Sequence, residues 1–106
     1  KVSEDLIVYM YEEWFEKLAK RLKISRVMQT KNTIELVFPK EVVSVFDTED
    51  VFMDAFYVTN MFRFISRGSN LVIVLDIIKL EKHPIYYLVS LLSKMDEKYG
   101  KALDLI

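Results

Sequence analysis

The sequence contains no cysteine, one histidine, two glycines and two prolines. Without cysteine, disulfides, thiolate metal sites and cysteine nucleophiles are excluded, and a reducing compartment is compatible with the sequence. Two glycines are too few for a glycine-rich phosphate loop. No apolar run approaches the ~20 residues of a membrane span, and no segment resembles a signal peptide. We therefore expect a cytoplasmic protein without membrane contact.

Constellations of catalytic or metal-binding residues are also missing. The single histidine, His83, directly precedes Pro84, and its nearest carboxylate in the sequence is Glu81. A metal site or nucleophile triad needs more ligands than this, which makes a position in a loop or before a helix the better interpretation. No loop follows calcium-hand spacing, and helix capping plus a solvated face explains the acidic group Asp47, Glu49, Asp50 and Asp54. We expect no enzyme activity, no catalytic or metal residue and no cofactor in this chain.

Charge is nearly balanced, with 15 basic and 16 acidic residues and a net charge of −1. A free-standing nucleic-acid-binding protein normally has a basic excess. The basic patch comprises Lys17, Lys20, Arg21 and Lys23, with Arg26 and Lys31 nearby. No aromatic residues alternate with it to stack on bases. A solvated helix face is the favoured interpretation, with Lys17, Lys20 and Arg21 as candidate partner contacts. The alternative is a small nucleic-acid-binding α+β module that uses the patch Lys17–Arg26.

Apolar residues make up 52% of the chain, above the ~45–50% usual for soluble domains. A chain of 106 residues is the size of one domain. Part of the surplus is therefore expected on the surface, as a docking face or as a face toward the rest of a larger protein, although scattered exposed side chains explain it as well. Tyr9, Tyr86 and Tyr87 are candidate partner contacts because aromatic residues are enriched at interface hot spots. Core packing is nevertheless favoured for Tyr86 and Tyr87.

A first helix is predicted to begin after Ser3, which is a good capping residue. Its apolar residues follow helical spacing: Ile7, Tyr11, Trp14, Leu18 and Leu22. The start of this helix, Leu6–Tyr11, is apolar on all sides and needs cover on two of them. Either the C-terminal LDLI tail or a neighbouring domain would supply that cover.

A hairpin follows the first helix. Two strands are predicted, Ile24–Thr30 and Thr33–Phe38. Lys31-Asn32 between them suits a tight turn because asparagine tolerates the left-handed conformation. This register places Val27 opposite Leu36 and Gln29 opposite Ile34. Glu35 and Val37 then lie on the other face of the hairpin.

The hairpin pattern occurs twice. Arg63–Leu75 aligns without a gap with Arg26–Phe38, and Arg67–Asn70 supplies the second turn. Leu71–Leu75 is apolar on both faces, which predicts a central, covered strand. The chain is therefore predicted to be a single α+β domain built of two α-β-β units with antiparallel hairpins plus a C-terminal helix.

The remaining helices are predicted from caps and spacing. Lys40–Phe46 is expected to form a short helical turn, and Asp47 or Thr48 caps the next helix. The inner face of that helix is either Val51, Ala55 and Val58 or Phe52, Phe56 and Thr59. The last helix begins at Pro84 and is expected to stop at Gly100. Its buried stripe is predicted to be Ile85, Leu88, Leu92 and Met95.

The stretch Leu18–Phe38 resembles the C-terminal domain of the bacterial transcription-repair coupling factor. In that family a helix ending in Leu-Ala-x-x-Leu-Gly-Ile precedes a strand, a short Gly- or Asn-containing turn and an apolar strand ending in Phe. The same order is found here in LAKRLKI, SRVMQTKN and TIELVF. Further along the chain, Met61–Asp76 is similar to the family's second hairpin. The likeness runs from about Leu6 to Met95. Lys23 stands where the family usually has glycine, which is tolerable if this junction does not need a positive φ.

The resemblance implies that residues 1–106 form a regulatory C-terminal domain cut from a larger protein. Its parent would be an ATP-driven DNA translocase that releases RNA polymerase stalled at lesions and recruits nucleotide excision repair through UvrA. The domain itself is implied to be non-catalytic and to mask the UvrA-binding module of the same protein. ATP, Mg²⁺, RNA polymerase and double-stranded DNA would be bound by other parts of the parent.

Overall fold

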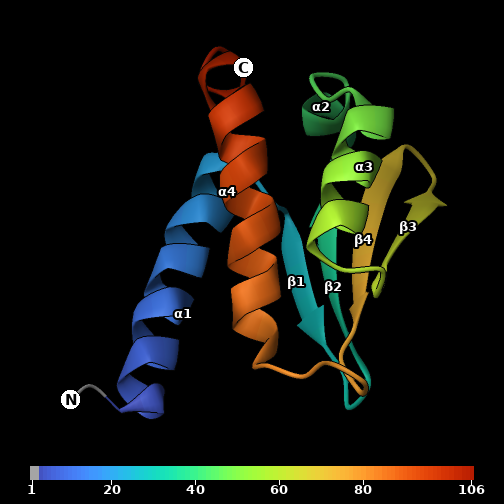
Figure 1. The fold of residues 1–106 in the computed structure, drawn as a ribbon. Helices are drawn as coiled ribbons and strands as arrows, with labels where there is room; N and C mark the ends of the chain where they lie inside the picture. The colour runs from blue at the N-terminus through green and yellow to red at the C-terminus, as the bar shows by residue number, and fades with distance from the viewer. Residues whose placement is uncertain (1–2) are drawn as a thin grey trace.

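A computed structural model describes residues 3–106, which form a four-stranded sheet and four helices (Figure 1). In chain order the elements are α1 (Glu4–Arg21), β1 (Arg26–Gln29), β2 (Thr33–Phe38), α2 (Lys40–Val43), α3 (Thr48–Val58), β3 (Phe62–Arg67), β4 (Asn70–Asp76) and α4 (Pro84–Leu103). The two predicted α-β-β units are therefore confirmed as α1-β1-β2 and α3-β3-β4. Helix α4 packs against both α1 and α3, and the α+β class is confirmed.

The sheet is antiparallel throughout, in the order β1-β2-β4-β3. The predicted register of the first hairpin is confirmed, with Val27 opposite Leu36 and Gln29 opposite Ile34. In the second hairpin Gly68 adopts φ +66, a left-handed conformation that costs glycine little and so permits the tight turn. The two hairpins thus meet along β2 and β4, which leaves β1 and β3 as the edges of the sheet.

The core lies between the helices and one face of the sheet. Side chains of β2 and β4 alternate in direction, and the set that faces the helices is fully or nearly fully buried: Ile34, Leu36, Phe38, Leu71, Ile73 and Leu75. Helices α1 to α4 all contribute residues to this one core. The strand Leu71–Leu75 is buried along its whole length, as predicted.

The opposite face of the sheet carries charged side chains around two buried valines, Val72 and Val74. Arg63 donates two hydrogen bonds to Asp76, at 3.0 and 3.2 Å. Arg67 lies 3.6 Å from the Glu35 carboxylate, which is too long for a hydrogen bond. Side chains of the neighbouring strands therefore cover the two valines on this face of the sheet.

Helix α1 ends in a left-handed turn at Lys23, where φ is +56. The Lys23 N–H donates to the Lys20 carbonyl at 3.1 Å, and the Ile24 N–H donates to the Ala19 carbonyl at 3.0 Å. These two bonds make a Schellman motif, which glycine usually closes. The junction therefore does need a positive φ, and Lys23 occupies the position where the family pattern has glycine.

Replacing Lys23 with glycine is expected to stabilise the protein. A side chain in the left-handed region costs about 1 kcal/mol, and part of this is offset because glycine gains freedom in the unfolded chain. We expect the free energy of unfolding to rise by about 0.5–1 kcal/mol, measured by urea denaturation. Lys20→Gly, in the last turn of the same helix, should be destabilising, and a Lys23→Gly variant that is also destabilised would contradict the argument.

The structure decides three predictions about the helices. The inner face of α3 is Val51 and Ala55, whereas Phe52 and Phe56 are 46% and 60% exposed. The predicted stripe of α4 is buried. The predicted stop at Gly100 is wrong, because α4 continues to Leu103.

Gly100 has a packing role inside α4. A Cβ at this position would collide with Oδ1 of Asp96 and lie 2.9 Å from Nη2 of Arg21. These are the partners of an ion pair between α4 and α1, in which Arg21 Nε donates to Asp96 Oδ1 at 2.7 Å. Glycine thus leaves room for a contact between helices and does not end this one.

The C-terminal tail does not cover the apolar start of α1. The tail lies at the other end of the helix, near Lys23, whose Nζ donates to the Ile106 carbonyl at 3.0 Å (Figure 1). Leu105 is 87% exposed. Of the two predicted sources of cover, the tail is therefore excluded, and no other segment of residues 3–106 covers the outer face of α1.

Candidate partner-binding surface

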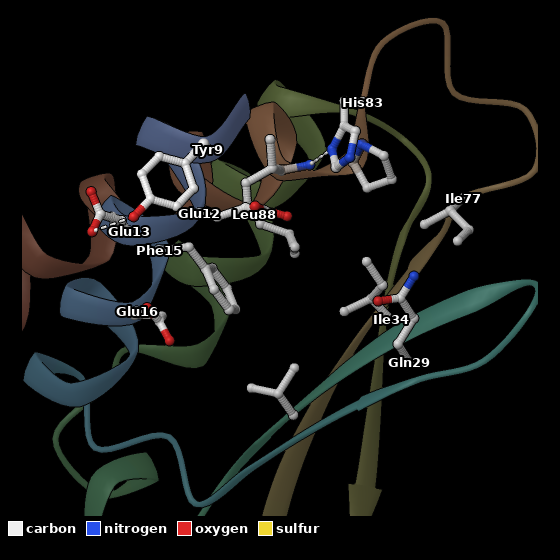
Figure 2. Close-up of a pocket in the computed structure, with 13 residues that line it drawn as sticks. Tyr9, Glu12, Glu13, Phe15, Glu16, Gln29, Ile34, Ile77, His83 and Leu88 are labelled. Carbon is white, nitrogen blue, oxygen red and sulfur yellow. Dashed lines mark hydrogen bonds between the residues drawn. The ribbon is translucent and has the colours of Figure 1, made fainter. Parts of the chain in front are cut away.

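An open groove of about 750 Å³ lies between the first half of α1, the first hairpin and the start of α4 (Figure 2). One wall comes from α1, with Tyr9, Glu12, Glu13, Phe15 and Glu16. The facing residues are Val27, Gln29, Ile34, Ile77, His83, Pro84, Ile85 and Leu88. The groove is therefore apolar within and acidic along one side, and none of the lysines and arginines in the described part of the chain, residues 3–106, lines it.

Tyr9 is the candidate tyrosine that lies at this groove. It is 56% exposed, and its hydroxyl donates to Glu13 at 3.4 Å. Tyr86 and Tyr87 are half-buried and pack against the core, which agrees with the favoured interpretation. Tyr86 packs edge-on against Tyr11 of α1, with ring centroids 4.8 Å apart.

The basic residues of the sequence patch do not form one basic face. Lys17 and Lys20 are exposed on α1. Arg21 is tied to Asp96, and that hydrogen bond holds the pKa of Arg21 above its ordinary value. Arg26 lies on the sheet face turned away from the groove, because its neighbour Val27 faces the groove.

His83 is the N-cap of α4, and its Nδ1 accepts the Ile85 N–H at 3.1 Å. The prediction of a pre-helix role is therefore confirmed. Within residues 3–106 no group of three or more His, Cys, Asp or Glu side chains is arranged to hold a metal ion. Over the same range no helix has the length and apolarity to cross a membrane.

The acidic group at the start of α3 splits into two parts. Asp47 caps α3 by accepting the Asp50 N–H at 3.2 Å, as predicted. Asp50 and Asp54 are not merely solvated, because both accept hydrogen bonds from Lys98 of α4, at 2.9 and 2.7 Å. Tyr99 adds a third bond by donating its hydroxyl to Asp50 at 3.1 Å. The group therefore ties α3 to α4 through Lys98 and Tyr99.

This network predicts a loss of stability in acid. The hydrogen bonds from Lys98 and Tyr99 hold the pKa of Asp50 below its ordinary value, so the unfolded state binds the proton first. The stabilising contribution of Asp50 is therefore present above about pH 4, the unfolded pKa, and is lost as the pH falls through the lower folded pKa. Urea midpoints should show Asp50→Asn destabilised relative to the unmodified protein at pH 7, and this deficit should be smaller at pH 3.

Glu49→Gln is the matched control for this prediction. Glu49 lies one residue before Asp50 in the same helix turn but is exposed and belongs to none of the ion pairs within residues 3–106. Its urea midpoint should follow that of the unmodified protein at both pH values. An Asp50→Asn deficit that is equal at pH 7 and pH 3 would contradict the assignment.

The structure has two exposed apolar stripes. The sequence indicated that the start of α1 needs cover, but it did not identify the stripe on α3 as an outer face. On α1, Leu6, Met10 and Trp14 are 49%, 58% and 46% exposed. On α3 the outer residues are Phe52, Met53, Phe56 and Tyr57, and Tyr57 is 85% exposed. Spacing of three or four residues marks both stripes, but spacing alone does not tell an outer apolar face from an inner one.

The chain was compared with known proteins. No family model and no curated protein matches it. Among solved structures it is similar to one described as "Crystal structure of C-terminal domain of transcription-repair coupling factor", with a TM-score of 0.73 and 17% sequence identity. The match covers 95% of this chain and 63% of that one, so the chain spans less than two thirds of the solved structure. The likeness shows that the two share a fold, and it confirms the resemblance found in the sequence at that level.

Proposed function

We propose that this chain is a non-catalytic regulatory interaction domain of a transcription-repair coupling factor. The observation that carries the proposal is the fold shared with the C-terminal domain of such a factor over 95% of the chain. Lys23 adds support, because it adopts a left-handed conformation where the family pattern has glycine. The parent would be an ATP-driven DNA translocase that releases stalled RNA polymerase and recruits nucleotide excision repair. Its motor would bind ATP, Mg²⁺ and double-stranded DNA outside this domain.

The regulatory contact would be made with the UvrA-binding module of the same protein, and it would mask that module until the motor engages. The outer face of α1 supports this role. Leu6, Met10 and Trp14 form an exposed apolar stripe, and the C-terminal tail lies at the far end of the helix and leaves the stripe open. An apolar stripe of this kind is typical of a protein interface.

The nucleic-acid alternative gains less support from the structure. One of its five cations, Arg21, is engaged by Asp96. Another, Arg26, lies on the sheet face turned away from the groove. A surface that tracks a phosphate backbone needs its cations together on one side, and these residues do not supply one.

The proposal is tested by titrating the 106-residue domain with the isolated UvrA-binding module in a calorimeter. We expect a complex, and we expect Met10→Glu to weaken it at least about tenfold, because a charge would then be buried in an apolar contact. Met53→Glu is the matched control. Met53 is 60% exposed and Met10 is 58% exposed, but Met53 lies on α3.

Two results together would contradict the masking role. One is the absence of a complex between the domain and the module. The other is an unchanged affinity of the parent protein for UvrA after this domain is deleted. Equal weakening by Met10→Glu and Met53→Glu would contradict the assignment of the contact to α1.

A further inference from the structure

The outer edge of β1 is open and faces the groove. Strand β1 pairs only with β2. At the turn, the Thr30 N–H donates to the Thr33 carbonyl at 2.8 Å. Since residues of an antiparallel strand bond to the partner alternately, Met28 and Arg26 bond to β2. Val27 and Gln29 therefore direct their N–H and C=O groups to the open edge.

The side chains of these same two residues line the groove. Helix α1 packs on α4 and lies beside the sheet, past β1 (Figure 1). No strand of the described residues 3–106 lies on the far side of β1. A fifth strand at this edge would lie beside the groove and would direct alternate side chains into it.

The charge of the groove indicates which kind of segment it would bind. Glu12, Glu13 and Glu16 line the α1 side, and among residues 3–106 no lysine or arginine lines the groove. None of the three glutamates belongs to an ion pair within residues 3–106. The floor offers apolar surface, including Val27, which is 44% exposed. An occupant that complements both features carries an apolar side chain between basic ones.

We infer that the open edge of β1 accepts an extended basic segment of a partner protein as a fifth strand. Backbone hydrogen bonds to Val27 and Gln29 would supply part of the affinity, as in other cases of strand addition. Side chains at alternate positions would enter the groove, where an apolar one packs on Val27 and its lysine or arginine neighbours meet the glutamates of α1. The inference uses a different surface from the apolar stripe of α1 and does not depend on the proposed function.

The probe is a short synthetic peptide in which lysine, valine and arginine alternate with threonine. Titrated into the ¹⁵N-labelled 106-residue protein, it should shift the amide signals of Val27, Gln29, Glu12 and Glu16. Because β1 has four residues, we expect a dissociation constant of roughly 0.1–1 mM, weakening with added salt. A peptide with glutamate in place of lysine and arginine should not bind.

Gln29→Pro distinguishes strand addition from binding to the groove through side chains alone. Proline removes an N–H that points to the open edge, so the bonds between β1 and β2 should persist, and binding should fall at least about tenfold. Gln29→Thr changes the same side chain but keeps the N–H, so it should bind the peptide more tightly than Gln29→Pro does. Unchanged amide signals for β2 and β4 verify the fold of the proline variant.

A second variant, Glu12→Gln with Glu16→Gln, tests the charge without touching the sheet. It should weaken the basic peptide about tenfold or more and remove most of the salt dependence. The inference is overturned if the peptide does not bind, if its signals shift on α3 instead, or if the acidic peptide binds equally well. Full binding by Gln29→Pro would also overturn it.

Discussion

Replacing Phe38 with alanine is expected to lower the free energy of unfolding by about 3–5 kcal/mol. Phe38 is fully buried at the end of β2, on the sheet face that meets the helices. Its ring packs edge-on against Phe46, with centroids 5.5 Å apart, and alanine would leave a cavity between the sheet and the segment after α2. Since small domains have about 5–15 kcal/mol of stability in total, the variant should be marginally folded.

Val37→Ala is the matched control for Phe38→Ala. Val37 is the preceding residue of β2, but its side chain is half-buried on the other face of the sheet. Its loss should cost about 1 kcal/mol, the transfer free energy of a partly exposed pair of methyl groups. Urea denaturation of both variants measures the difference. Equal losses would contradict the assignment of the core to the helix-facing side.

The hairpins were predictable because their signals are local. Alternation of apolar and polar residues sets the register of β2, and the turn residues mark where each hairpin reverses. The left-handed asparagine expected at Lys31-Asn32 is wrong: neither residue has a positive φ, and Thr30 Oγ1 accepts the Asn32 and Thr33 N–H groups at this turn. The alignment of Arg26–Phe38 with Arg63–Leu75 predicts two similar hairpins. It does not predict that β2 and β4 pair at the centre of the sheet, because that pairing depends on how the two units pack.

The helix ends show where local signals fail. Glycine often ends a helix, yet Gly100 lies within α4 because the Asp96–Arg21 contact leaves no room for a Cβ. Conversely, Lys23 ends α1 although lysine avoids the left-handed region. In both cases contacts or backbone geometry beyond the residue's own preference decide the structure.

The groove could not be predicted from the sequence either. It exists because α1 packs on α4 and stands beside the edge of the sheet. Glu12, Glu13 and Glu16 have the pattern of an ordinary solvated helix face, and only the position of β1 opposite them makes a charged wall. The pairing of Lys98 with Asp50 and Asp54 is likewise a contact between helices far apart in the sequence.

Leu103→Ala tests the part of α4 beyond Gly100 and is expected to cost about 2–5 kcal/mol. Leu103 has no exposed surface and belongs to the main core. A helix that stopped at Gly100 would leave this residue in a loose tail, where its truncation would cost almost nothing. The size of the loss in urea denaturation therefore distinguishes the two structures directly.

Leu105→Ala supplies the control, since it removes the same atoms two residues later. Leu105 is 87% exposed and follows the end of the helix, so its loss should lie within about 0.5 kcal/mol of zero. A large loss at Leu103 with none at Leu105 places the last turn of α4 in the core. Small losses at both positions would instead support a helix that ends at Gly100, and would make the Asp96–Arg21 contact the true boundary of the α1–α4 packing.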